Sequence, residues 1–316
     1  MRRILIGMLL AMLSMAADAQ SESQTEYNFL RLPASAHAAA LGGDNISIVE
    51  DDEMMMLQNP ALLLGVTPKM VTLGYMNYMS GCNYAMAAYN TVIDEKWNVG
   101  VAAQYMSYGS MKQTDAANND LGTFSAQDLA VSGTLAYELA TNLSGGITAR
   151  FIHGNIGSYN SMAVGVDLGL NYYDPESEWS FAFTGRNLGG QIKSYDETFE
   201  KMPIDFLLGV SKRLVGSPLR LSMTLGDLGH WSYKFIDHVT VGADVILSPQ
   251  LYVAGGYSFR RAHEMEITSG EGEKSSHGAG FSLGVGVLLD RFKVNVAYGK
   301  YHVSASSLMA NVAFTL

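Results

Sequence analysis

Residues 277–289 read HGAGFSLGVGVLL, and large apolar side chains occupy alternate positions through most of this stretch. Phe281 and Leu283 alternate with Ser282 and Gly284. Successive side chains of a β-strand point to opposite faces of its sheet, so this segment has one apolar face and one face of small residues. A soluble sandwich would carry many Lys and Glu residues on its outward face, and here they are rare. The pattern predicts a closed membrane barrel with lipid outside and a polar lumen inside.

The same alternation recurs from Met70 to Leu316 and predicts fourteen antiparallel strands. An even number is expected of a single-chain bacterial outer-membrane barrel. The predicted strands span 70–79, 83–92, 97–108, 126–139, 143–153, 160–173, 179–187, 203–213, 218–227, 237–247, 250–260, 277–289, 292–301 and 306–316. This all-β membrane fold is therefore expected to fill residues 70–316.

The lengths of the predicted connections divide into two sets. The connections after even-numbered strands are tight turns, such as 94–96 and 290–291. The long connections all follow odd-numbered strands, and they span 109–125, 188–202, 228–236 and 261–276. Bacterial barrels have short periplasmic turns and longer external loops. We therefore expect the long connections outside the cell and both chain ends on the periplasmic side.

The first nineteen residues have the pattern of a signal peptide. Arg2 and Arg3 precede the apolar run 4–15, and Ala17-Asp18-Ala19 provides a small-residue cleavage site. The chain has 316 residues, a formal net charge of −10 and no basic cluster, which argues against nucleic acid as a partner. Its one cysteine, Cys82, excludes an internal disulfide and is most simply a buried small residue. We expect export to the outer membrane and contact with its lipid.

Residues 20–69 lack the strand alternation and predict short helices. One helix is expected from Pro33 to Gly42-Gly43, one from Asp51 through Leu57, and one after Asn59-Pro60, where Asn can cap the helix and Pro suits its first position. A fourteen-strand barrel is too wide for its own side chains to fill. We therefore expect residues 20–69 to form an N-terminal plug.

The inward face of the predicted barrel carries charges of both signs. Such charges could form a proton path or a substrate track, but a structural network that locks the strands to each other and to the plug is the simpler interpretation. The predicted lumen residues are Asp128, Glu138, Arg150, Asp167, Arg186, Asp205, Arg220, Asp244 and Lys293. Aromatic residues at predicted strand ends, including Trp97, Trp179, Tyr173 and Trp231, suggest an interfacial girdle.

Several segments resemble the FadL-like outer-membrane barrels, in particular the PorV/PorQ family of the type IX secretion system. The plug-like part of the resemblance is Leu32-Pro33-Ala34-Ser35-Ala36, Ala40-Leu41-Gly42-Gly43, the acidic run 50–53 and Asn59-Pro60-Ala61. The barrel part comprises 75–78, 186–193, 203–205, 209–212, 218–222, Asp227-Leu228 and Trp231. The resemblance covers nearly the whole chain after the predicted signal peptide.

This resemblance implies a barrel without catalysis or a cofactor. It implies an anchor for a large surface protein, PorZ, in the complex that attaches secreted cargo and also contains PorU and PorV. No family motif marks the partner-binding residues. From the loop positions alone, we expect aromatic contacts at Tyr108, Phe124, Tyr195 and Phe199.

Two other functions remain open from the sequence. FadL-like barrels include channels for hydrophobic small molecules, and inward glycines such as Gly284 and Gly286 could leave a gap beside the plug, or could let the plug pack closely. An enzyme is the weaker alternative. His153 and His302 lie near external strand ends, but no Ser or Asp is linked to them by a catalytic motif, and the seven histidines lack metal-ligand spacing.

Overall fold

The computed structural model describes residues 25–79, 81–93, 96–231, 233–268, 274–276, 278–302 and 305–316. The predicted signal peptide lies outside the described residues. Within the described ranges, no helix combines the length and the apolar composition required to cross a membrane.

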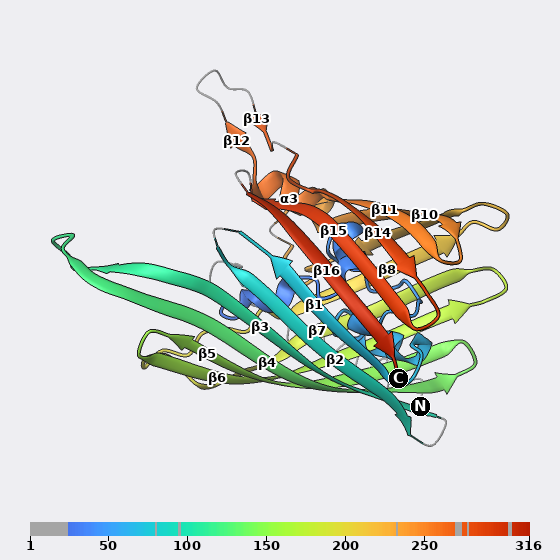
Figure 1. Cartoon of the computed structure of the whole chain (residues 1–316), viewed down its shortest axis with the longest axis horizontal. Helices are drawn as coiled ribbons and strands as arrows, with labels where there is room; N and C mark the ends of the chain where they lie inside the picture. Colours follow the sequence, from blue (N-terminus) through green and yellow to red (C-terminus); the bar gives the residue numbers. More distant parts are fainter. Residues whose placement is uncertain are drawn as a thin grey trace.

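Fourteen antiparallel strands close into one barrel (Figure 1), which confirms the predicted fold class and strand number. Each strand pairs with its neighbours along the chain, and β1 closes the barrel against β16. The barrel strands are β1 Met70–Asn77, β2 Asn83–Ile93, β3 Trp97–Thr114, β4 Asp120–Ala140, β5 Leu143–Ile156, β6 Tyr159–Asp174, β7 Trp179–Lys193, β8 Asp205–Arg213, β9 Leu219–Leu225, β10 Val239–Ser248, β11 Leu251–Ser258, β14 Phe281–Leu288, β15 Phe292–His302 and β16 Ala305–Thr315.

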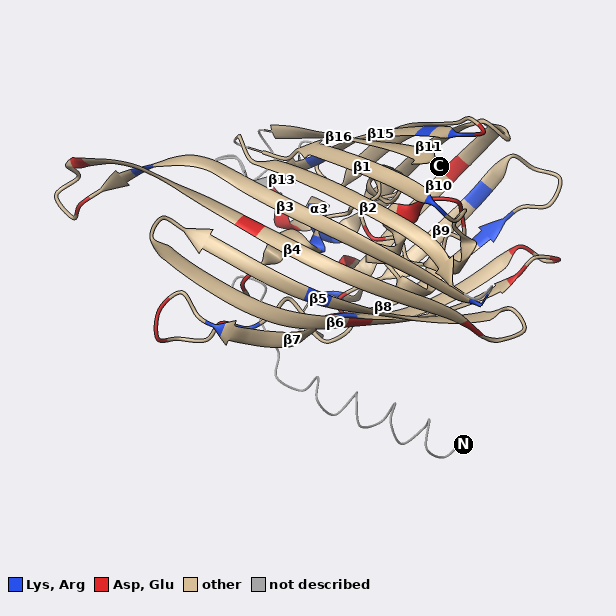
Figure 2. Cartoon of the chain, turned by 60° about the horizontal axis from the view of Figure 1, so that its bottom comes forward, with Lys and Arg blue, Asp and Glu red and all other residues tan. Residues whose placement is uncertain are grey.

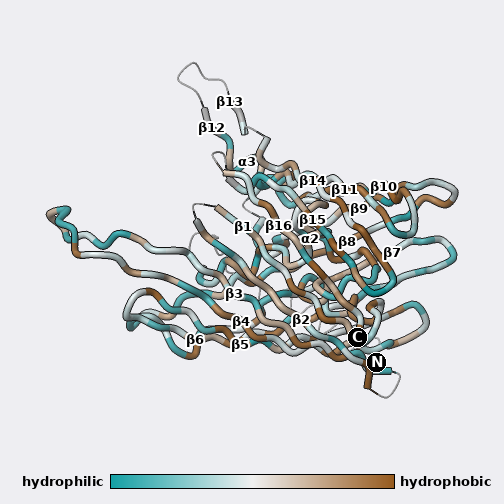
Figure 3. The backbone as a smooth tube through the Cα atoms, in the orientation of Figure 1, coloured by the Kyte–Doolittle hydropathy of each residue, from teal (hydrophilic) through white to brown (hydrophobic). Residues whose placement is uncertain are grey.

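The predicted facing of the strands is also confirmed. On β14, Leu283 and Val285 are 60% and 41% exposed. Ser282 of the same strand points to the other face and is buried. Outward apolar and inward small or polar residues alternate in the same way on β6 and β16. Figure 3 shows hydrophobic colour along the strands and hydrophilic colour at the connections. In Figure 2, the charged residues gather mainly toward the two ends of the barrel, as expected for a wall that faces lipid.

The long connections are more ordered than the sequence predicts. Strand β3 continues to Thr114, and strand β4 begins at Asp120. Most of the predicted loop 109–125 is therefore a projecting two-stranded hairpin. Strand β7 likewise extends to Lys193. The connection after β11 contains helix α3 Phe259–Glu264 and a small hairpin of β12 Ile267–Thr268 and β13 Lys274–Ser275. The alternation of apolar and polar residues fades at these strand ends, but the backbone hydrogen bonding continues. Segments predicted as irregular loops are therefore paired strands.

Residues 25–69, here called the inner segment, contain the three short helices expected from the sequence, α2 Ala36–Ala40, η3 Glu53–Leu57 and η4 Pro60–Gly65. A further short helix, η2 Asn28–Arg31, was not predicted. Their caps follow side-chain chemistry: the side chains of Ser35, Asp52 and Asn59 accept hydrogen bonds from the first turns of α2, η3 and η4. Helices of four to six residues are unstable alone, so packing must hold them in place.

The inner segment packs inside the barrel against both halves of the wall (Figure 1). Helix α2 contacts β11, β14, β15 and β16, and η4 contacts β3, β4, β5 and β6. Inward glycines make this approach possible. A Cβ atom at Gly146 would lie 2.4 Å from the carbonyl carbon of Pro60, and one at Gly284 would lie 2.5 Å from the Cβ of Ala40. At these positions the small inward residues therefore accommodate the inner segment.

Candidate functional site

The inner segment is joined to the wall by a closed ring of four charged side chains. The Nδ1 and Nε2 atoms of His37 lie 2.6 Å from oxygens of Glu50 and Asp244, respectively. Arg220 donates to the same two carboxylates, at 2.7 Å to Asp244 and 3.1 Å to Glu50. His37 and Glu50 belong to the inner segment, whereas Arg220 and Asp244 lie on β9 and β10. Each carboxylate is therefore shared by two donors, and we call this group the ion-pair ring.

The ion-pair ring favours a charged imidazole. Burial alone would lower the pKa of His37, but the charges of Glu50 and Asp244 and the hydrogen bonds to both raise it to about 9. Burial would raise the pKa of Glu50, and the opposite effects of His37 and Arg220 lower it below its usual value. Tyr252 also stacks on the His37 ring, with centroids 4.0 Å apart. His37 is thus held as a cation between two carboxylates.

The acidic run 50–53 meets a different environment at each position. Asp51 pairs with Lys293 of β15, and Asp52 accepts a hydrogen bond of 2.6 Å from the Ser35 hydroxyl. Burial, followed by the charge of Glu50, raises the pKa of Asp52 to about 6. Glu53 is fully buried, and burial raises its pKa to about 8. Burial therefore favours the protonated, neutral form of Glu53, and the nearby charge of Lys293 acts in the opposite direction.

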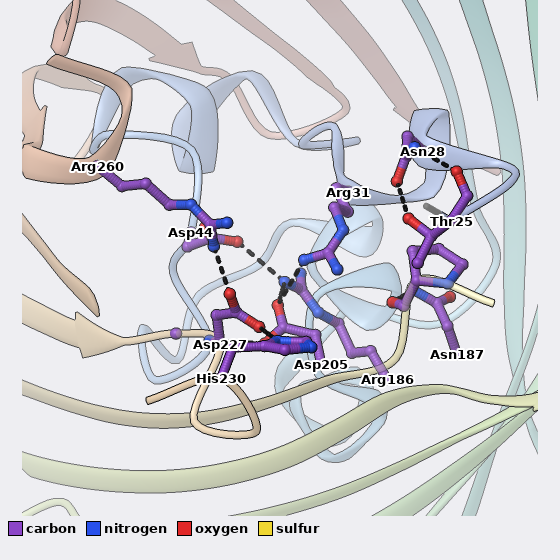
Figure 4. A network of polar contacts seen from close by, with 12 residues as sticks. Thr25, Asn28, Arg31, Asp44, Arg186, Asn187, Asp205, Asp227, His230 and Arg260 are labelled. Atoms are coloured by element: carbon purple, nitrogen blue, oxygen red, sulfur yellow. Dashed lines mark hydrogen bonds and ion pairs between the residues drawn. The ribbon is translucent and has the colours of Figure 1, made fainter. Parts of the chain in front are cut away.

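A second network lies toward the long-loop end of the lumen (Figure 4). Arg186 donates at 2.9 Å to Gln58, at 3.0 Å to Asp44 and at 2.8 Å to Asp205. The Asp227 amide donates to the other oxygen of Asp205, at 2.7 Å. This arrangement ties the inner segment to β7 and β8.

The same network continues into α3. Asp227 accepts from Arg260 at 2.7 Å and also contacts the His230 ring. Arg260 reaches Glu264 of α3 at 2.8 Å and lies over the Tyr233 ring. The network therefore extends from the inner segment to the connections at the barrel rim.

A third group forms where β7 bulges against β6. The pairing shifts between Val166 and Leu168, and Asn187 has a positive φ of 58°. Arg150 donates to Asp167 at 2.7 Å and to the Asn187 side chain at 2.5 Å, and the Asn187 amide donates to Asp167 at 2.7 Å. The bulge thus places an extra inward side chain beside an Arg–Asp pair.

Most of the predicted lumen residues take part in these networks. Arg150, Asp167, Arg186, Asp205, Arg220, Asp244 and Lys293 all form ion pairs. Asp128 is buried separately and accepts a 2.7 Å hydrogen bond from Tyr108. Glu138 differs from the prediction: its side chain is exposed near the tight turn after β4, beyond the inner segment. A network of ion pairs between strands and inner segment accounts for most of the inward charges.

The predicted partner-binding aromatics do not form one exposed patch. Tyr108 is half-buried and points to Asp128. The Tyr195 hydroxyl would lie 2.0 Å from a Cβ at Gly154, so its side chain is folded onto the barrel rim. Phe124 is also half-buried, and Phe199, at 62% exposure, is the one fully exposed member of the four. Tyr108 and Tyr195 are therefore placed as wall contacts instead of projecting anchors.

The described residues form two notable hollows. A cavity of about 210 Å³, here called the mouth cavity, lies at the long-loop end between the inner segment, α3 and the ends of β11 and β15. A shallow apolar groove of about 550 Å³, the outer-wall groove, crosses the outside of β3 to β7. Val101, Val131 and Phe151 line the outer-wall groove, together with small residues at Gly133 and Gly165.

Sequence reasoning missed the inner-segment members of these networks. His37, Glu50 and Asp44 pair with barrel charges, and Asn187 and His238 were not selected either. One signal was available: the acidic run 50–53 has no Lys or Arg within ten positions on either side, so any Lys or Arg partner had to come from farther along the chain, as Arg220 and Lys293 do. Within the described part of the chain, no group of three or more potential metal ligands is present.

Neither a protein-family model nor a curated protein matches the sequence. Solved structures match in fold. The toluene transporter TodX of Pseudomonas putida is 12% identical, with a TM-score of 0.57 over 89% of this chain and 96% of that one. A FadL homologue of Pseudomonas aeruginosa is 9% identical, with a TM-score of 0.55 over 89% and 98%. The monoaromatic hydrocarbon channel CymD is 12% identical, with a TM-score of 0.51 over 88% and 95%.

These likenesses and the closed barrel define the class of protein. The chain is a fourteen-strand outer-membrane β-barrel with the FadL-like fold. Of these similar structures, TodX is described as a transporter and CymD as a channel.

Proposed function

We propose that this chain is a channel for small hydrophobic molecules, in a closed conformation. The observation that carries the proposal is the likeness to hydrocarbon channels over about nine-tenths of the chain. The outer-wall groove supports it, because an apolar hollow on the lipid-facing side suits a ligand that moves between protein and membrane. Val101, Val131 and Phe151 would contact such a ligand.

The inner segment would control passage through this channel. It occupies the lumen, and the ion-pair ring and the Arg186 network fix it to the wall. Opening therefore requires the inner segment to move while the wall remains closed. The short helices suit this role, since little internal structure is lost when they shift.

A reversible crosslink tests this proposal. A Cβ at Gly209 of β8 would lie 3.2 Å from the Cβ of Ser47, slightly closer than the roughly 3.5 to 4.5 Å of a disulfide, and 2.6 Å from Cγ1 of Ile46, so the bond needs a small shift of the inner segment. In a Cys82→Ala background, Ser47→Cys with Gly209→Cys should form a disulfide that ties the inner segment to the wall. Toluene uptake by cells that express this variant should be lost under oxidation and restored by a reductant.

The single variant Ser47→Cys is the matched control and should transport toluene under both conditions. Uptake by the oxidised double variant at the rate of the control would contradict movement of the inner segment. No uptake by the parent chain, with folded barrel present in the outer membrane, would reject the channel.

The second candidate function is the non-catalytic anchor of the type IX attachment complex, as a PorQ-like protein. The projecting β3–β4 hairpin favours it, because it extends well beyond the rest of the barrel and presents paired strands for a partner (Figure 1). The partner would be a large PorZ-like surface protein, together with PorU and PorV. Phe199 would add an exposed aromatic contact.

Shortening the long connections separates the two functions. If the chain is an anchor, removal of 112–123 should leave a folded barrel and release the surface partner into the medium. If it is a channel, the same variant should still take up toluene. A mild-detergent pull-down through a periplasmic tag would identify the partner. Retention of that partner after the loops 109–125, 188–202 and 261–276 are all shortened would reject the anchor.

A further inference from the structure

The mouth cavity contains buried polar groups that the networks described above leave without partners. It lies beside Gly42 and Gly43 of the inner segment, and its volume far exceeds the roughly 10 to 15 Å³ that one water molecule needs. Its lining is strongly charged, with four arginines and five acidic residues. Most of these charged side chains form ion pairs with one another. Among the described residues, Arg261 forms no such pair.

Arg261 is held rigidly but lacks a carboxylate. It donates at 2.9 Å to the Gly280 carbonyl and at 2.7 Å to the Ser282 hydroxyl, and its guanidinium lies 4.4 Å from the centre of the Tyr301 ring. No carboxylate of the described residues forms an ion pair with it. Its free nitrogens are therefore available to an anion, and no rearrangement is needed to present them.

Gly43 leaves space for such an anion. A Cβ at this position would lie 3.7 Å from both Nη1 of Arg261 and the Tyr301 hydroxyl, so two donors border the space above one glycine. The backbone of Gly43 has a φ of +105°, which side chains rarely tolerate. The position is thus suited to keeping this space open.

The same cavity also presents acceptors. The Nδ1 atom of His238 contacts the Gly226 carbonyl at 2.9 Å, which requires a proton on Nδ1 and leaves Nε2 as an acceptor. Nε2 is buried and has no hydrogen-bond partner among the described residues. Asp44 and Glu264 each use one oxygen in an ion pair, to Arg186 and Arg260. The second oxygen of each carboxylate can accept a further hydrogen bond.

We infer that the mouth cavity binds a small zwitterion with one carboxylate and one ammonium group, of the size of an amino acid. The carboxylate would accept from Arg261 and Tyr301 above Gly43. The ammonium group would donate to His238, Asp44 or Glu264. The balance of charge supports this class: a lone anion would add to a lining that already has five acids against four arginines, and a lone cation would leave Arg261 unpaired. This inference does not depend on what the barrel transports or anchors.

Three matched probes test the ligand class by calorimetry on the full chain in detergent. L-alanine has both charged groups, propionate lacks the ammonium group and ethylamine lacks the carboxylate. We expect saturable binding of alanine and about tenfold weaker binding of the other two, because each leaves buried charged groups unpaired. Equal binding of propionate would indicate an anion site, and absence of alanine binding would also overturn the inference.

Variants locate the site. Arg261→Gln should weaken alanine binding about tenfold, and Tyr301→Phe should weaken it by a smaller factor while keeping the ring under the guanidinium. Arg291→Gln is the matched control, because Arg291 is exposed at a tight turn at the other end of the barrel. Heat-modifiable gel mobility shows whether each variant is folded. Unchanged affinity in folded Arg261→Gln would overturn the inference, and if that variant does not fold, unchanged affinity in Tyr301→Phe would do so.

Discussion

The ion-pair ring and the network of Arg186, Asp205, Asp227 and Arg260 beside the mouth cavity, here called the mouth network, use the same kinds of charged side chain but differ in completeness. In the ring, His37 and Arg220 share two carboxylates, and Asp244 is fully buried. In the mouth network, a cavity of about 210 Å³ lies beside the ion pairs, and among the described residues no carboxylate pairs with Arg261. A closed set of charges fixes the inner segment, whereas an incomplete set beside a cavity can bind a ligand. The two ends of one lumen therefore serve different purposes.

The largest expected effect is at the ring. Asp244→Asn removes one carboxylate shared by His37 and Arg220 and leaves two cations facing Glu50 alone. Breaking a buried charged group in this way typically costs about 3 to 5 kcal/mol of the free energy of unfolding. This loss in the free energy of unfolding can be measured by urea unfolding, with the folded fraction followed by gel mobility. Asp120→Asn, in an exposed pair with Lys112, is the control and should cost less than about 1 kcal/mol; equal costs would show that the ring is not what fixes the inner segment.

The second effect is on pH dependence. His37 contributes stability that is complete below its ordinary pKa of 6.5 and is lost as pH rises through about 9, which corresponds to roughly 3 kcal/mol. Glu53 acts in the same direction, because its pKa rises from 4.5 to about 8 on burial and its proton must leave as pH increases. After correction for the intrinsic base-catalysed rise of amide exchange with pH, the hydrogen-exchange protection of the inner segment should therefore fall between pH 6 and pH 9.5. An unchanged rate in His37→Gln relative to the parent over this range would contradict the role of His37.

A smaller effect is expected where the inner segment meets the wall. Gly284→Ser places a Cβ 2.5 Å from Ala40 and 2.8 Å from the Val296 carbonyl, and such overpacking costs about 1 to 3 kcal/mol. Gly133→Ser is the control, because nothing lies within 4 Å of the added Cβ on the outer face of β4. Urea unfolding of both variants compares the two faces. Equal stability would mean that the inner segment does not press on β14.

The smallest effect is expected at the mouth network. Asp227→Asn weakens the bond to Arg260, but Arg260 keeps Glu264 and the adjacent cavity can admit water. We expect a loss of about 1 to 2 kcal/mol by the same unfolding measurement. A loss as large as that of Asp244→Asn would remove the distinction between the closed ring and the open mouth.

The barrel wall was predictable because its physical cause is local. A period of two in hydrophobicity follows from strand geometry and a lipid exterior, so the number, order and facing of the strands could be read from the sequence. The cap Asn59 was also predicted, since an N-cap acts within three residues, whereas Ser35 and Asp52 were not identified as caps. The end of β3 at Thr114 was predicted too early and the start of β4 at Asp120 too late, because backbone pairing continues where the apolar pattern fades.

The sequence by itself thus determined a lipid-facing barrel, its inward charges and a separate N-terminal segment of short helices. Only the tertiary structure decided which charges meet. His37 and Asp244 are 207 positions apart, and within the described residues the position of α3 leaves Arg261 beside a hydroxyl and a carbonyl instead of a carboxylate. Ion pairing depends on distances of a few ångströms between groups far apart in the chain, and no local pattern encodes those distances. The same reason explains why Tyr108 and Tyr195 lie against the wall, although their loop positions suggested exposed contacts.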